Sequence, residues 1–111
     1  MKTSHQDFGH VTVVTLSGEF TGDDAERFTR DMGDRIASGA RDLVFDCENL
    51  EFIDSAGLEA MLRLRDRAAE RMGQVRLVRP DPNVAKILEI TRLGRVFQSH
   101  ESLESAVRSL R

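Results

Sequence analysis

Hydrophobic positions along this chain alternate between the spacing of strands and the spacing of helices. Apolar, β-branched runs at residues 11–16, 43–45 and 75–78 predict buried strands. Helical spacing follows each run, and the predicted helices cover about residues 23–38, 56–72 and 84–91, with a terminal amphipathic helix at 103–110. A weaker strand is expected at 3–8 and a short last strand at 96–97.

This order of elements predicts an α/β fold. Strands that alternate with helices pair mostly in parallel, and the first strand should lie antiparallel at an edge after the turn at Gly9. We therefore expect a mixed, mostly parallel sheet of about four to five strands with about four helices. A length of 111 residues suits one compact domain spanning 1–111.

The turn Asp54-Ser55-Ala56-Gly57 joins a predicted strand to a predicted helix. Ser55 is expected to be the N-cap, whose hydroxyl accepts from N–H groups of the first helical turn. A helix N-terminus also tolerates a phosphate, because free N–H groups and the helix dipole point toward it. Local chemistry leaves both roles open. Asp23 and Glu26 resemble a capping box for the first helix.

Three segments carry a resemblance to a known family. LSGEF at 16–20, IDSAGL at 53–58 and PNVAKILEITRLGRVF at 82–97 resemble the STAS domain family, specifically the small bacterial anti-sigma factor antagonists. The order and spacing of these segments fit nearly the whole chain. In that family the serine after the aspartate of the second segment is the phosphoacceptor, and Ser55 occupies the matching position.

The resemblance implies a non-enzymatic, partner-switching regulator. Such a protein binds an anti-sigma factor serine kinase when unphosphorylated, is released when phosphorylated on Ser55, and is restored by a serine phosphatase. The resemblance and the charges around the turn give the expected partner-binding residues: Thr21, Asp23, Asp24, Asp54, Ala56, Gly57 and Glu59. The chain departs from the family at Thr21, where an acidic residue is common, and at Ala56 and Glu59, which replace a serine and a glycine.

Gly57 has a physical role distinct from that of Ser55. A glycine in a first helical turn costs about 1 kcal/mol relative to alanine, so its presence predicts close approach by another backbone. That backbone belongs either to the fold or to a partner. Phe52 and Leu58, which flank the turn, are expected in the core.

Composition and charge exclude several classes of function. The net charge of -3, without a basic run, argues against nucleic acid as a direct partner. No apolar run approaches the roughly 18 residues of a membrane span, and the first residues lack the apolar core of a signal peptide, so we expect a cytoplasmic protein without membrane insertion. The single Cys47 is expected to be a small buried hydrophobe.

Catalytic and cofactor motifs are missing from the sequence. Asp46 and Asp54 are only a weak signal for acid–base or metal chemistry, and IDSAG is not the nucleophile elbow of a hydrolase. No histidine is expected near Ser55, and neither phosphate-binding glycine motif occurs. We therefore expect no enzyme activity, no metal site and no cofactor.

A second function remains compatible with the resemblance. Some STAS proteins are non-switching scaffolds or accessory subunits of sensory or lipid transport complexes. In such a protein Ser55 would serve only as a helix cap.

Overall fold

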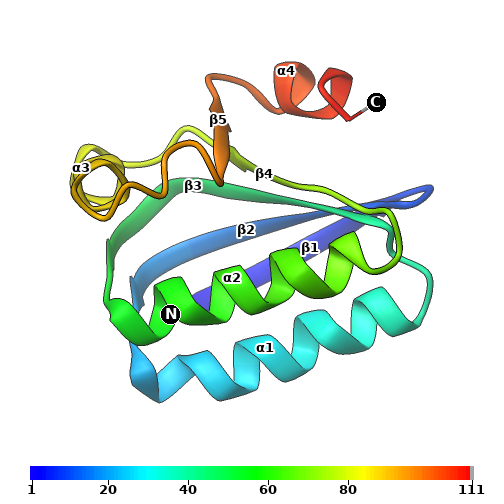
Figure 1. The fold of residues 1–111 in the computed structure, drawn as a ribbon, viewed down its shortest axis with the longest axis horizontal. Coiled ribbons are helices and arrows are strands. Elements are labelled where there is room, and N and C mark those ends of the chain that lie inside the picture. Colours follow the sequence, from blue (N-terminus) through cyan, green and yellow to red (C-terminus); the bar gives the residue numbers. More distant parts are fainter. Residues whose placement is uncertain (111) are drawn as a thin grey trace.

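The computed structural model describes residues 1–110, which form a five-stranded sheet and four helices (Figure 1). The elements in chain order are β1 (Lys2–Phe8), β2 (Val11–Phe20), α1 (Gly22–Ala37), β3 (Asp42–Ile53), α2 (Ser55–Ala69), β4 (Val75–Val78), α3 (Pro82–Ile90), β5 (Gln98–His100) and α4 (Leu103–Arg108). The predicted α/β class is confirmed.

The strands lie in the order β1-β2-β3-β4-β5, and β1 pairs antiparallel with β2 while the other pairs are parallel. The expected antiparallel edge strand is therefore confirmed. Phe20 and Ile53, the last residues of β2 and β3, are partners in the parallel register. Because α1 and α2 follow these strands directly, the two helices begin side by side.

Helices cover both faces of the sheet. The larger core cluster joins inward side chains of α1, α2 and α3 to the sheet, and the ring of Phe28 contacts the rings of Phe20 and Phe45 at centroid distances of 4.8 and 5.7 Å. The smaller cluster packs Ala106 of α4 against Val44 and other valines of the opposite face. Figure 1 shows α1 and α2 side by side on one side of the sheet and α4 on the other.

The last strand and two helix ends differ from the sequence predictions. The strand expected at 96–97 lies at 98–100, because the N–H groups of Val96 and Phe97 each donate to the Leu93 carbonyl at 3.0 Å and close a turn. The helices predicted at 56–72 and 84–91 end earlier, at Ala69 and Ile90. Met72 and Arg92 take the left-handed conformation, with φ of 63° and 62°, and the N–H groups of the next residues donate to the carbonyls of Ala68 and Leu88, five positions earlier.

Candidate functional site

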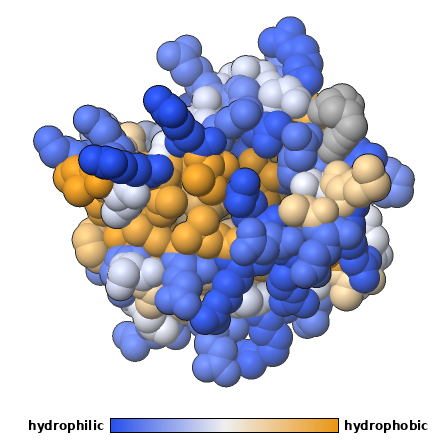
Figure 2. Space-filling view, viewed as in Figure 1, coloured by the Kyte–Doolittle hydropathy of each residue, from blue (hydrophilic) through white to orange (hydrophobic). Residues whose placement is uncertain are grey.

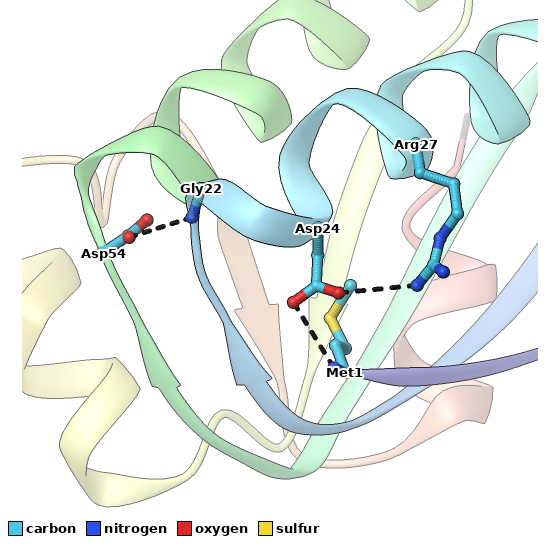
Figure 3. A network of polar contacts seen from close by, with 5 residues as sticks. All are labelled: Met1, Gly22, Asp24, Arg27 and Asp54. Atoms are coloured by element: carbon cyan, nitrogen blue, oxygen red, sulfur yellow. Dashed lines mark hydrogen bonds and ion pairs between the residues drawn. The ribbon is translucent and has the colours of Figure 1, made fainter.

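Asp54 connects the starts of α1 and α2. Its Oδ1 accepts from the backbone N–H of Gly57 at 2.9 Å, and its Oδ2 accepts from the N–H of Gly22 at 3.1 Å (Figure 3). The Asp54 N–H in turn donates to the Phe20 carbonyl at 3.0 Å. A single half-buried carboxylate therefore serves N–H groups of two helix N-termini, which have no partner within their own helices.

The prediction that Ser55 is the N-cap is wrong. Asp54 holds that position, and Ser55 is the first residue of α2. The physical reason is that the Asp54 carboxylate, one residue earlier, already accepts the N–H that a serine cap would have taken. Ser55 is exposed, and its hydroxyl forms no hydrogen bond with any of residues 1–110.

The capping box expected at Asp23 and Glu26 is also absent from α1. The N-cap position belongs to Thr21, whose side chain makes no capping hydrogen bond; the Asp24 N–H donates to the Thr21 carbonyl at 3.0 Å, and the Gly22 N–H donates to Asp54 from across the turn. Asp24 turns away from that contact and pairs with Arg27 and the amino group of Met1, each at 3.4 Å (Figure 3).

Gly57 is required by the fold itself. A Cβ at this buried position would lie 2.7 Å from the Phe20 carbonyl oxygen and 2.8 Å from Cγ1 of Ile53. Both distances are shorter than side chains tolerate, so the backbone of β2 makes the close approach that the sequence implied. A part for Gly57 in partner binding stays a prediction.

The surface around Ser55 carries charges of both signs and is partly grooved. Asp23 is exposed, and Glu59, one helical turn beyond Ser55, is exposed and paired with Arg63 at 2.6 Å. Ala56 is half-buried and faces a surface groove between α1 and α2. That groove is lined by small and charged residues: Gly22, Ala25, Glu26, Thr29, Arg30, Asp34, Ala56, Glu59, Ala60, Arg63 and Arg67.

Sequence reasoning misplaced Phe52, which is 42% exposed at the end of β3. The register between β2 and β3 shifts between Gly18 and Glu19, whose partners are Leu50 and Phe52. This irregularity inserts an extra residue, so Phe52 faces outward and Ile53 is buried. Leu58 is buried in the core, as predicted.

The other reactive groups are engaged or buried. Asp46 accepts from Arg79 at 3.1 Å and from the Glu48 N–H at 3.2 Å. Burial, assisted by the charge of Asp46, raises the pKa of the Cys47 thiol to about 12. Within residues 1–110, His, Cys, Asp and Glu side chains form no group of three that could hold a metal ion. No helix of that part of the chain has the length and apolar character needed to cross a membrane.

The fold is shared with solved anti-sigma factor antagonists. A candidate antagonist from Thermotoga maritima superposes with a TM-score of 0.91 at 20% identity, covering 98% of this chain and 94% of that one. SpoIIAA in its unphosphorylated form superposes with a TM-score of 0.84 at 23% identity, covering 96% and 93%. The phosphorylated form of the Bacillus protein gives 0.77 at 22% identity, covering 99% and 100%.

Sequence comparison identifies the family. A STAS-domain containing protein of Pseudomonas aeruginosa is 32% identical over 90 residues, which cover 81% of this chain and 88% of that protein. BtrV of Bordetella bronchiseptica, described as a candidate anti-sigma factor antagonist, is 26% identical over 106 residues, covering 96% and 91%. The family model of the STAS domain matches residues 3–106. The chain belongs to the STAS domain family.

Proposed function

We propose that this chain is an anti-sigma factor antagonist that works by partner switching in the cytoplasm. Without phosphate it binds a serine kinase that is also an anti-sigma factor, and the sigma factor is released. Phosphorylation of Ser55 ends that binding, and a serine phosphatase restores it. The observation that carries the proposal is the exposed Ser55 hydroxyl, which forms no hydrogen bond within residues 1–110 because Asp54 provides the cap.

The start of α2 is suited to a phosphate. Phosphorylation adds about −1.5 to −2 charges at neutral pH. The first turn of α2 holds no acidic residue, so the positive end of its dipole is neutralised there only by the Asp54 cap. Ser55 is exposed, so the phosphate remains hydrated. We therefore expect the fold to survive phosphorylation.

The loss of binding must then arise where the partner meets the turn. Asp23 is exposed at this surface and Glu59 is paired with Arg63, so a phosphate on Ser55 adds negative charge that a docked surface would have to desolvate. Shifting a complex from 99% to 1% bound requires roughly 5.5 kcal/mol. The free-energy cost of burying a double negative charge in an interface, or of placing it against a like charge, is of that order. Thr21, Asp54, Ala56 and Gly57 complete the proposed contact, with Asp24 at its margin.

The comparisons support this proposal. SpoIIAA adopts the same fold in an unphosphorylated and a phosphorylated form. BtrV, described as a candidate anti-sigma factor antagonist, aligns with almost the whole chain. The proposal assigns catalysis to the kinase and the phosphatase and none to this chain.

Phosphotransfer tests the proposal directly. Incubation with the cognate kinase and ATP should add one phosphate by intact mass, and Ser55→Ala should receive none. Ser99→Ala, an exposed serine on β5, is the matched control and should be phosphorylated like wild type. Phosphate uptake by Ser55→Ala, or a site mapped to Ser17 or Thr21, would refute the switch.

Partner binding separates the switch from the scaffold function. Ser55→Asp should bind the kinase more weakly than wild type, and Ser55→Ala should bind constitutively. Calorimetric titration of both variants measures this difference. If both bind like wild type, the chain is a non-switching scaffold or accessory subunit.

A further inference from the structure

Strand β1 leaves one edge of the sheet open. It comes first in the strand order, so it pairs with β2 on one side and with no described strand on the other. Its 7 residues are all exposed, contain no proline, and pair with β2 without a register shift. Proteins usually shorten, bulge or guard such an edge, because its outward N–H and C=O groups can pair with another chain. Strand β1 therefore offers a template for the addition of a further strand.

A surface groove runs between this edge and α1, and we call it the α1–β1 groove. Thr3, His5 and Asp7 lie on the α1 side of the sheet, because their register partners on β2 are buried on that side. These three side chains line the groove, and α1 packs mainly against α2 and leaves β1 uncovered. An extended peptide added to β1 would therefore turn every second side chain toward the groove.

The α1 wall of this groove is acidic. Asp31 and Asp34 line it, are exposed, and form no ion pair with any other residue of 1–110. Asp7 is paired with Arg35 at 3.3 Å, so those two charges offset each other. Asp34 lies in the last turn of α1 and Asp31 in the turn before, where the negative end of the helix dipole adds to their potential. The groove therefore favours cationic side chains.

Apolar contacts contribute little to this site. Figure 2 shows mainly hydrophilic side chains over α1, and the apolar band on that face of the molecule lies above this helix in the view. A segment bound at β1 would therefore depend on backbone hydrogen bonds and on charge.

A second copy of this chain fits the edge less well than a basic segment. Two β1 strands paired about a twofold axis would place both α1 helices on the same side of the joined sheet. Asp31 and Asp34 of the two copies would then approach one another, and like charges at an interface repel. Pairing of β1 with the opposite edge is limited by β5, which has only 3 residues.

We propose that β1 binds an extended segment of another protein by strand addition, and that this segment carries lysine or arginine at the alternate positions that face the α1–β1 groove. Hydrogen bonds to the β1 backbone hold the segment, while Asp31 and Asp34 select its charge. Both aspartates lie in the C-terminal half of α1, whereas the Ser55 turn meets its N-terminus through Asp54. The two sites are separate, so this inference does not depend on the proposed function.

A fluorescent heptapeptide of alternating lysine and valine tests the proposal in an anisotropy titration with the whole chain. Asp31→Lys/Asp34→Lys should weaken binding by about tenfold or more, because the new charges repel the lysines. Glu70→Lys/Glu101→Lys is the matched control, since it makes the same change in net charge at exposed positions outside the groove, and it should bind within about twofold of wild type. The peptide with glutamate in place of lysine should bind at least about tenfold more weakly.

Strand addition also has a backbone signature that charge attraction lacks. Along an extended peptide, the N–H groups of successive residues point to opposite sides, so either the lysines or the valines donate to β1. N-methylation of one of these two sets should abolish binding, while N-methylation of the other should leave it within about threefold. The bound peptide should also slow amide exchange in β1.

Three results would overturn the proposal. The first is no binding of the lysine peptide to wild type at about 1 mM. The second is equal behaviour of the two N-methylated peptides, which would show attraction by charge without strand pairing. The third is slowed exchange in β1 without peptide that increases with protein concentration, together with a dimer in sedimentation, which would assign this edge to a second copy of the chain.

Discussion

Substitution of Asp54 should show that its two carboxylate oxygens have separate structural roles. Oδ1 caps α2 through Gly57, and Oδ2 binds the N–H of Gly22 in α1. Asp54→Ala removes both contacts. Asp54→Asn retains one carbonyl oxygen, and asparagine is a good N-cap, so it should keep the contact with Gly57 and lose the contact with Gly22.

The expected losses follow from the two contacts. Removal of a capping side chain costs about 0.5 to 2 kcal/mol. The contact with Gly22 adds about 0.5 to 1.5 kcal/mol, toward the lower end because Gly22 is exposed and water can replace the carboxylate. Asp54→Ala should therefore lose about 2 kcal/mol of unfolding free energy and Asp54→Asn about 1 kcal/mol or less.

Equilibrium unfolding in urea measures these losses, and amide hydrogen exchange locates them. Asp54→Asn should accelerate exchange at Gly22 and leave Gly57 protected, whereas Asp54→Ala should accelerate exchange at both. Ser55→Ala is the control and should change the unfolding free energy by less than about 0.5 kcal/mol. If Ser55→Ala costs as much as Asp54→Ala, the hydroxyl caps α2 in solution and the reasoning about a free Ser55 fails.

Three further predictions concern Gly57, Cys47 and phosphorylated Ser55. Gly57→Ala should lower the unfolding free energy measured in urea by about 1 to 3 kcal/mol, although alanine has the higher helix propensity, because the added Cβ would meet the Phe20 carbonyl. The control Gly94→Ala, whose Cβ meets nothing within 4 Å, should not lower the unfolding free energy. With the thiol pKa raised from 9.0 to about 12, stability should fall as pH rises between these values, because the unfolded chain ionises first. Cys47→Ala should remove that decline, of at most about 1.4 kcal/mol per pH unit, and an unchanged decline would contradict the burial argument. Thermal melts of phosphorylated and unphosphorylated protein should agree within a few degrees, and a large drop in melting temperature would show that the phosphate acts on the fold.

Most elements of this fold could be predicted because their hydrophobic spacing is uninterrupted, although the short last strand was misplaced. Residues 43–45 are apolar without a break, and Phe28, Met32 and Ile36 repeat at helical spacing on one buried face of α1. The spacing of apolar residues shows directly which face of an element is buried, so it can be interpreted without knowledge of tertiary contacts. The general place of the candidate site followed from the same signals, since the turn lies between a confirmed strand and a confirmed helix.

The details of the turn depend on contacts between distant segments, which local sequence does not encode. Asp54 and Ser55 are both good capping residues, and the choice between them is set by the pairing of Phe20 with Ile53, which brings Gly22 within reach of the carboxylate. Phe52 was misplaced for a similar reason, because a register shift reverses the faces of a strand without a mark in the sequence.

The separation of the cap, Asp54, from the proposed phosphorylation site, Ser55, would allow the proposed charge switch to operate in so small a domain. If Ser55 were the cap, phosphorylation would convert the group that orders the turn, and each switching event would disturb both helix starts. Here the carboxylate of Asp54 accepts hydrogen bonds from the N–H groups of Gly22 and Gly57, while the Ser55 hydroxyl forms no hydrogen bond among the described residues. A phosphate can therefore alter the potential at the surface while the backbone beneath it keeps its shape. The free energy of the added charge is then available to act on a bound partner instead of being absorbed by rearrangement of the turn.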